Sequence, residues 1–105
     1  MLELDEHSNG QIVDLKIGQT AVIGLSENPS TGFQWTLASN GEPACTLVSD
    51  SFEAGIERPG QAGFHRWHFQ ATHAAAGVVE LHYRQPWDKS TAPSRTFTLA
   101  VRVHL

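Results

Sequence analysis

Three histidines that lie close together in the sequence, His65, His68 and His73, are the first candidates for metal ligands. Imidazole nitrogens bind zinc and other transition metals when several of them converge on one point. The residues around these histidines alternate between apolar and polar types, which predicts a β-strand with successive side chains on opposite faces. His68 then faces away from the other two, and His82 and His104 fall on the outward rows of later strands. We therefore expect no metal site.

Cysteine, serine and threonine side chains are the candidate nucleophiles. The single Cys45 has no histidine and no turn beside it to activate its thiol, so we interpret it as a small apolar side chain of the core. Ser30 and Thr31 lack the strand–turn–helix setting that exposes a serine nucleophile. The sequence also lacks a glycine-rich phosphate loop and a basic aromatic platform for nucleic acid. We expect no catalytic residues and no cofactor.

One short segment is rich in turn-forming residues and consists of Asn28, Pro29, Ser30, Thr31, Gly32 and Phe33. Pro29 fixes its own φ angle and favours an extended Asn28. The Asn28 side chain can bond the backbone two residues on, and the following hydroxyls can do so more weakly. Gly32 permits a positive φ, and Phe33 then anchors the segment in the next strand. Two interpretations remain open: an ordinary turn, or a stiff loop that is presented to a partner.

A second unusual segment consists of Arg84, Gln85, Pro86 and Trp87, and a polar stretch up to Pro93 follows it. Alternation stops before it, so Trp87 lies in a loop. The indole can fold back on the core, or it can be exposed for a partner, because tryptophan often dominates the energetics of protein interfaces.

The elements that position these residues are β-strands, because apolar residues recur with period two and helical periodicity is nearly absent. We predict about seven strands with turn signals about every ten residues, which is typical of an antiparallel β-sandwich. The strand segments are 12–17, 20–25, 33–37, 44–54, 66–72, 79–84 and 97–104. The predicted core consists of Trp35, Trp67, Phe69, Leu81, Tyr83, Phe97, Leu99 and Val101.

Length and composition restrict the class of protein. With 105 residues the chain forms one domain, residues 1–105, and nothing demands more than a monomer. A net charge of -4 argues against binding to nucleic acid or to anionic membranes, and no apolar run reaches transmembrane length. The acidic N-terminus does not resemble a signal peptide. We expect a periplasmic or secreted protein if a signal peptide was removed, and a cytoplasmic one otherwise.

In such a sandwich, alternate loops gather at the same end. Three loops therefore belong together: loop 1 (residues 28–33), loop 2 (residues 60–63) and loop 3 (residues 84–87). Loop 2 consists of Gly60, Gln61, Ala62 and Gly63. Clustering of loops at one end is what a binding module requires.

In their order and spacing, these three motifs resemble those of the chagasin-type inhibitors of papain-like cysteine peptidases. The resemblance implies an immunoglobulin-like fold. It also implies that loop 1 enters the peptidase cleft while loops 2 and 3 contact its walls. There are two departures from the family pattern. Ser30 replaces the first of two threonines, and Gln85 stands where the family usually has arginine, with Arg84 one position earlier.

The function that this resemblance implies is reversible, tight-binding inhibition of papain-like peptidases of the cathepsin L type, by occlusion of the active-site cleft. The alternative is an immunoglobulin-like adhesion or ligand-binding module that uses the same loops for another partner. No residue pattern favours an enzyme.

Overall fold

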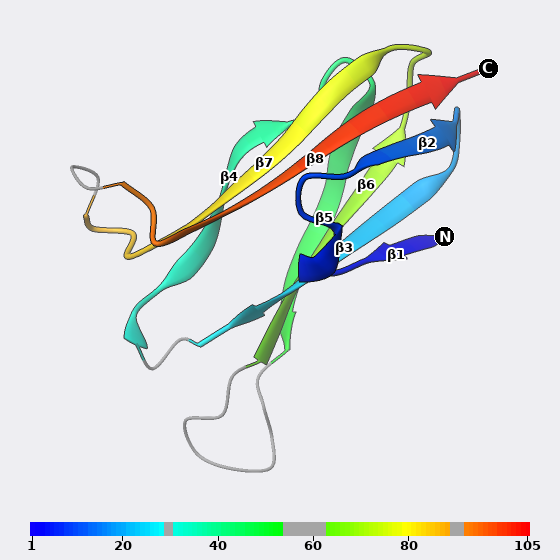
Figure 1. Ribbon diagram of the computed structural model, residues 1–105. Coiled ribbons are helices and arrows are strands. Elements are labelled where there is room, and N and C mark those ends of the chain that lie inside the picture. The colour runs from blue at the N-terminus through cyan, green and yellow to red at the C-terminus, as the bar shows by residue number, and fades with distance from the viewer. Residues whose placement is uncertain (29–30, 54–62, 89–91) are drawn as a thin grey trace.

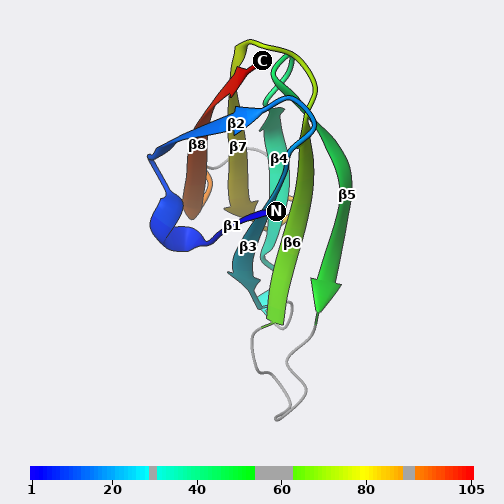
Figure 2. The same cartoon turned by 90° about the vertical axis from the view of Figure 1, so that its right-hand side faces the viewer.

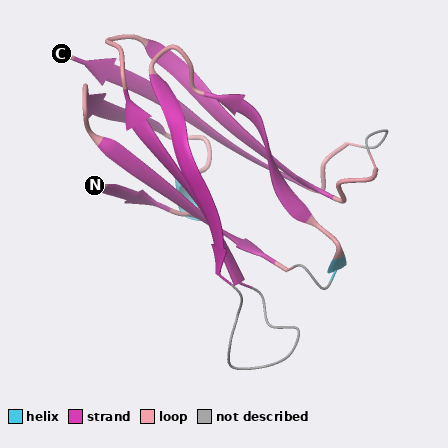
Figure 3. Ribbon diagram, turned by 180° about the vertical axis from the view of Figure 1, so that it is seen from behind, coloured by secondary structure: helices cyan, strands magenta, loops and turns pink. Residues whose placement is uncertain are grey.

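The computed structural model describes residues 1–28, 31–53, 63–88 and 92–105, which form two four-stranded β-sheets packed face to face (Figure 1). Sheet A has the strand order β1-β3-β6-β5, and sheet B has the order β2-β8-β7-β4. The elements are β1 (Leu2–Leu4), a 3-10 helix (Glu6–Ser8), β2 (Ile12–Lys16), β3 (Thr20–Glu27), β4 (Gln34–Asn40), β5 (Cys45–Glu53), β6 (Gly63–Ala71), β7 (Ala76–Arg84) and β8 (Arg95–His104). Figure 2 shows the sandwich from the side, and Figure 3 shows that strands make up most of it.

The predicted β-sandwich is confirmed, with one strand more than expected in the described part of the chain. The additional strand is β1, which has only three residues and so shows no alternation in the sequence. It pairs in parallel with β3, and β2 pairs in parallel with β8, whereas the other pairs are antiparallel. Both parallel strands lie at sheet edges. The sandwich is antiparallel, as predicted, apart from these two edge pairs.

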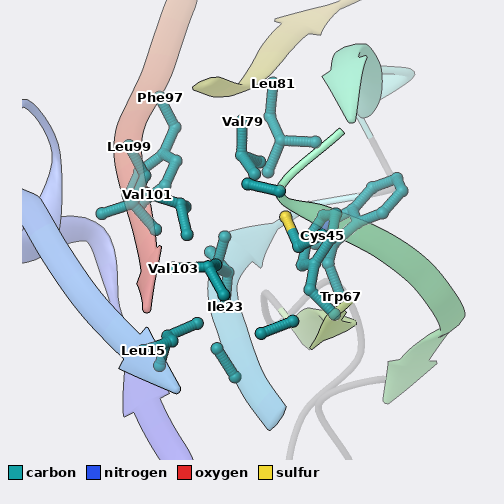
Figure 4. Packing of buried hydrophobic residues seen from close by; sticks show 14 of the residues in the cluster. Leu15, Ile23, Cys45, Trp67, Val79, Leu81, Phe97, Leu99, Val101 and Val103 are labelled. Carbon is teal, nitrogen blue, oxygen red and sulfur yellow. The ribbon is translucent and has the colours of Figure 1, made fainter. Parts of the chain in front are cut away.

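Alternate side chains of the two sheets fill the space between them, as the period-two pattern predicts (Figure 4). Seven of the eight predicted core residues are buried, and Tyr83 is half-buried against them. Trp35 and Trp67 are among the buried residues, which confirms the interpretation of both as structural. The close-packed core between the sheets thus holds the strand ends, and with them the starts of the loops, in fixed positions.

A β-bulge changes which side chains of β5 face the core. The register with β6 shifts between Leu47 and Ser49, and Val48 between them is exposed. Beyond the bulge Asp50 lies opposite Trp67, and Phe52 lies opposite His65. Because directly opposite residues of an antiparallel pair share a face, Asp50 and Phe52 turn toward the inner side of the sheet.

Candidate functional site

The described ends of loops 1 and 2 lie side by side on sheet A. Glu27, the last residue of β3, pairs with Gly63, the first residue of β6. Glu53, the last residue of β5, pairs with Phe64. The chain therefore leaves toward loop 1 and returns from loop 2 at the same end of this sheet.

Loop 3 reaches the same end of the molecule from sheet B. Arg84, the last residue of β7, pairs with Gln34, the first residue of β4 after loop 1. The far side of loop 1 thus adjoins the start of loop 3. In Figure 1 the ends of β3, β5 and β7 all lie away from the two termini, which lie on the right. The described strand ends that bound the three loops therefore lie at one end of the molecule, in agreement with the predicted clustering.

Direct contacts join loop 1 to loop 3. Gly32 has a φ of +79°, and its backbone lies against the Trp87 ring so closely that a Cβ atom would be 2.6 Å from Cη2 of the indole. The Gln85 side chain donates a long hydrogen bond of 3.5 Å to the Thr31 carbonyl. The described parts of the two loops thus form one continuous surface.

Loop 1 is also held from within. The Thr31 hydroxyl donates to the Asn28 carbonyl at 2.8 Å, and the Thr31 N–H donates to the same oxygen at 3.3 Å. The Asn28 N–H donates to the Tyr83 hydroxyl at 3.2 Å. These bonds connect the two described ends of the loop to each other and to β7.

An aromatic cluster supports loop 1 from below. The Phe33 ring stacks on Tyr83 with centroids 5.4 Å apart, and Trp35 lies 4.9 Å from the same ring. The Arg95 guanidinium lies over both Trp35 and Tyr83, at 5.5 and 5.9 Å from their centroids. The predicted anchoring of the loop by Phe33 agrees with this packing.

Trp87 is 71% exposed, which decides between its two sequence interpretations. It does not fold back into the core but lies on Gly32 at the tip of loop 3. A backbone bond from the Asp88 N–H to the Gln85 carbonyl, 3.0 Å long, closes the turn beneath it. Trp87 therefore presents most of its surface outward at the loop end.

The two residues before Pro86 have different surroundings. Arg84 belongs to β7, lies opposite Gln34, and has a buried Nε atom without a hydrogen-bond partner among the described residues. Gln85 instead reaches loop 1 through Thr31. Arg84 consequently does not take the place of an arginine at position 85.

Some candidate residues lie outside the described part of the chain. Pro29 and Ser30 of loop 1 and Gly60, Gln61 and Ala62 of loop 2 fall in this group. The contacts predicted for them with a partner remain predictions.

The histidines are arranged as the alternation predicts, but one of them has partners that the sequence analysis did not identify. His65 shares the inner face of β6 with Trp67, and His68 is on the other face. His65 lies between two carboxylates, Glu27 and Asp50. The inward position of Glu27 could have been predicted, because this residue continues the row of β3 that contains the buried Leu25. Within the described ranges, no cluster of three or more potential ligands is placed to hold a metal ion.

Cys45 is 1% exposed, and burial together with the neighbouring Glu42 carboxylate raises the pKa of its thiol. The thiolate, which is the reactive form, is therefore disfavoured in the folded protein. We expect a thiol reagent at pH 8 to label Cys45 only after unfolding in denaturant, with mass spectrometry as the measurement. Rapid labelling of the folded protein would contradict the interpretation of Cys45 as a side chain of the core.

The described part of the chain contains no helix that is long and apolar enough to span a membrane.

Comparison with known proteins gives concordant matches. A family model described as Chagasin family peptidase inhibitor I42 matches residues 14–101. Amoebiasin-1 of Entamoeba histolytica is 33% identical over 97% of this chain and 99% of its own length. Chagasin of Trypanosoma cruzi is 28% identical over 91% of this chain and 92% of its own. The crystal structure of the cysteine protease inhibitor EhICP2 from Entamoeba histolytica superposes with a TM-score of 0.84 at 21% identity, covering 98% of this chain and 94% of that one.

Proposed function

The chain belongs to the chagasin family of peptidase inhibitors, and we propose that it inhibits papain-like cysteine peptidases by placing loops 1, 2 and 3 in and beside the active-site cleft. The family is one of inhibitors rather than enzymes. The observation that carries the proposed mode of binding is the contact between Gly32 and Trp87. This contact joins two of the three predicted loops before any partner binds.

The mechanism is occlusion of a groove that binds extended peptide and contains a reactive thiolate. The described ends of loop 1 are preorganised by the bonds of Thr31 to Asn28 and of Asn28 to Tyr83. A loop that is already ordered loses little conformational entropy on binding, so more of the contact energy contributes to affinity.

An inhibitor of this kind must also resist cleavage. Cleavage requires a peptide carbonyl to lie on the nucleophile with its oxygen among the oxyanion donors. In loop 1 the Asn28 carbonyl accepts two bonds from Thr31, and the Thr31 carbonyl accepts one from Gln85. These oxygens would have to leave their partners before they could accept oxyanion bonds, which favours a stable complex over hydrolysis.

The size of the surface fits a tight complex. Three loops in contact with a cleft should bury an interface of ordinary size, about 1,600 Å², which is compatible with nanomolar or tighter binding. Because one set of loops occupies one cleft, we expect a complex of one inhibitor with one peptidase.

Titration of papain with the purified chain tests the proposal. Residual activity should fall linearly to zero at one equivalent, cathepsin L should behave in the same way, and trypsin, a serine peptidase, should be unaffected. An adhesion or ligand-binding module would leave all three activities unchanged, and that result would reject inhibition as the function.

A further inference from the structure

A half-buried histidine connects the strands from which loops 1 and 2 emerge. His65 is the third residue of β6, just after loop 2, and its side chain is 14% exposed. Its Nδ1 lies 3.3 Å from Oε2 of Glu27 at the end of β3, and its Nε2 lies 2.7 Å from Oδ2 of Asp50 on β5. These three residues, the Glu27–His65–Asp50 cluster, link three neighbouring strands of sheet A.

Packing holds the imidazole in place between the carboxylates. The His65 ring stacks on Trp67 with centroids 4.2 Å apart and an interplanar angle of 11°. Phe52 contacts the ring edge-on, at 6.4 Å. The ring therefore has little freedom to turn away from either carboxylate. The bulge at Val48 is needed for this arrangement, because it turns both Asp50 and Phe52 inward.

Glu27 extends the cluster to the other side of loop 1. Its side chain is 7% exposed, and its Oε1 accepts a 2.7 Å bond from the backbone N–H of Trp35 on β4. The Trp35 indole donates in turn to the carbonyl of Ser26, at 2.9 Å. Glu27 precedes loop 1 and Trp35 follows it, so this carboxylate ties the two ends of the loop together.

The protonation of His65 decides how many of these bonds exist. A neutral imidazole has one N–H donor, whereas both ring nitrogens of His65 face carboxylate oxygens. Only the imidazolium donates to both, and bonds between charged groups are the stronger kind. Without that cation, no described residue would place an opposite charge beside the buried Glu27 carboxylate, and an unpaired buried charge is costly.

Among the residues that the structure describes, no other group around the cluster replaces this charge. The cluster receives the Trp35 N–H from β4, and the face of the Trp67 ring from the strand of His65 itself. From sheet B, Arg84 lies opposite Gln34 on β4, and Arg95 lies over the rings of Trp35 and Tyr83. Arg66 pairs with Glu53 on the outer face of sheet A.

We propose that His65 is a positioning residue for the inhibitory loops, and that inhibition weakens as its imidazolium loses a proton. The inference rests on the proposed function. Deprotonation leaves one N–H on the ring, so that one of the two carboxylates loses its bond. Loss of the second bond loosens the ends of loops 1 and 2, which then bind with a larger entropic cost.

The experiment compares the wild-type chain with His65→Gln, which is neutral at every pH. The inhibition constant for papain is measured for both at pH 5 and pH 8, and the ratio of the two constants removes the titration of the peptidase itself. We expect the wild type to bind about tenfold more tightly than the variant at pH 5 and within about twofold at pH 8. Thermal melts at both pH values establish that each variant is folded.

Two further variants complete the test. His104→Gln removes a histidine that pairs with Asp14 at 2.8 Å on the edge of sheet B, away from the loops, and its ratio should stay near one at both pH values. Asp50→Asn removes the charge of the more exposed of the two carboxylates, so this variant should still fold if His65→Gln does not. It should weaken binding at pH 5 and less so at pH 8.

The outcomes separate the two claims. One outcome is that the wild-type chain inhibits papain while the ratio of variant to wild-type inhibition constants is the same at both pH values for His65→Gln and for Asp50→Asn. That result would overturn the role of His65 and leave the proposed function intact. A wild-type chain that inhibits at neither pH would overturn both.

Discussion

Replacement of Trp87 by alanine is expected to weaken the inhibition of papain by about thirtyfold, which corresponds to about 2 kcal/mol of binding free energy. The side chain is 71% exposed in the free protein, so it has a large apolar surface to bury against a partner. Its ring also lies on Gly32, so that truncation removes the support of loop 1 by loop 3. Both losses act in the same direction.

The variant should remain as stable as the wild type, because exposed side chains contribute little to the free energy of unfolding. Ile12→Ala is a suitable control, since Ile12 is 59% exposed and begins β2, at a distance in the fold from the loop end. It should change neither the inhibition constant nor the melting temperature. Equal inhibition constants for Trp87→Ala and the wild type would show that Trp87 is not part of the interface.

The second large effect is expected for Gly32→Ala. At a φ of +79° an alanine is strained by about 1 kcal/mol, and its Cβ would be 2.6 Å from Cη2 of Trp87. The indole must then move off its position on loop 1. We expect a loss of about 2 kcal/mol in binding, comparable to the removal of Trp87 itself.

Gly18→Ala is the matched control for backbone strain. Gly18 has a φ of +92°, and a Cβ atom there would meet nothing within 4 Å. Both variants should therefore lose a similar amount of stability in denaturant unfolding, whereas only Gly32→Ala should lose inhibition. If the two variants inhibit papain equally well, the position of Trp87 on Gly32 is unimportant for binding.

The two substitutions should not be additive. Because Gly32→Ala acts mainly by displacing Trp87, the double variant should lose less affinity than the sum of the two single losses. Full additivity would mean that the two residues act independently.

Much of the fold could be predicted because most strands are buried on one face only. The alternation of Trp67 and Phe69 with polar neighbours is enough to identify both a strand and its inner face. The bulge in β5 was not predicted, although Leu47 and Phe52 cannot share a face on a regular strand. When the inward-facing positions of one strand change from odd to even residue numbers, the strand contains an extra residue, which is a β-bulge.

The candidate site was predicted in part for a similar reason. Proline, glycine and tryptophan identify the loops through local chemistry, whereas the contact of Gly32 with Trp87 joins residues far apart in the sequence. The role of His65 depends in the same way on Glu27 and Asp50, which come from other strands. The sequence around His65 predicts its face but not its partners.

The position of the two termini has a practical consequence. Leu2 pairs with Ala21 near the start of β3, and β8 ends at His104, so both ends of the chain lie opposite the loops (Figure 1). A tag, a fluorescent carrier or a solid support attached at either end would leave the loops facing outward. Two copies fused in tandem through a flexible linker would each keep a free loop end, and such a bivalent molecule could capture two peptidase molecules at once.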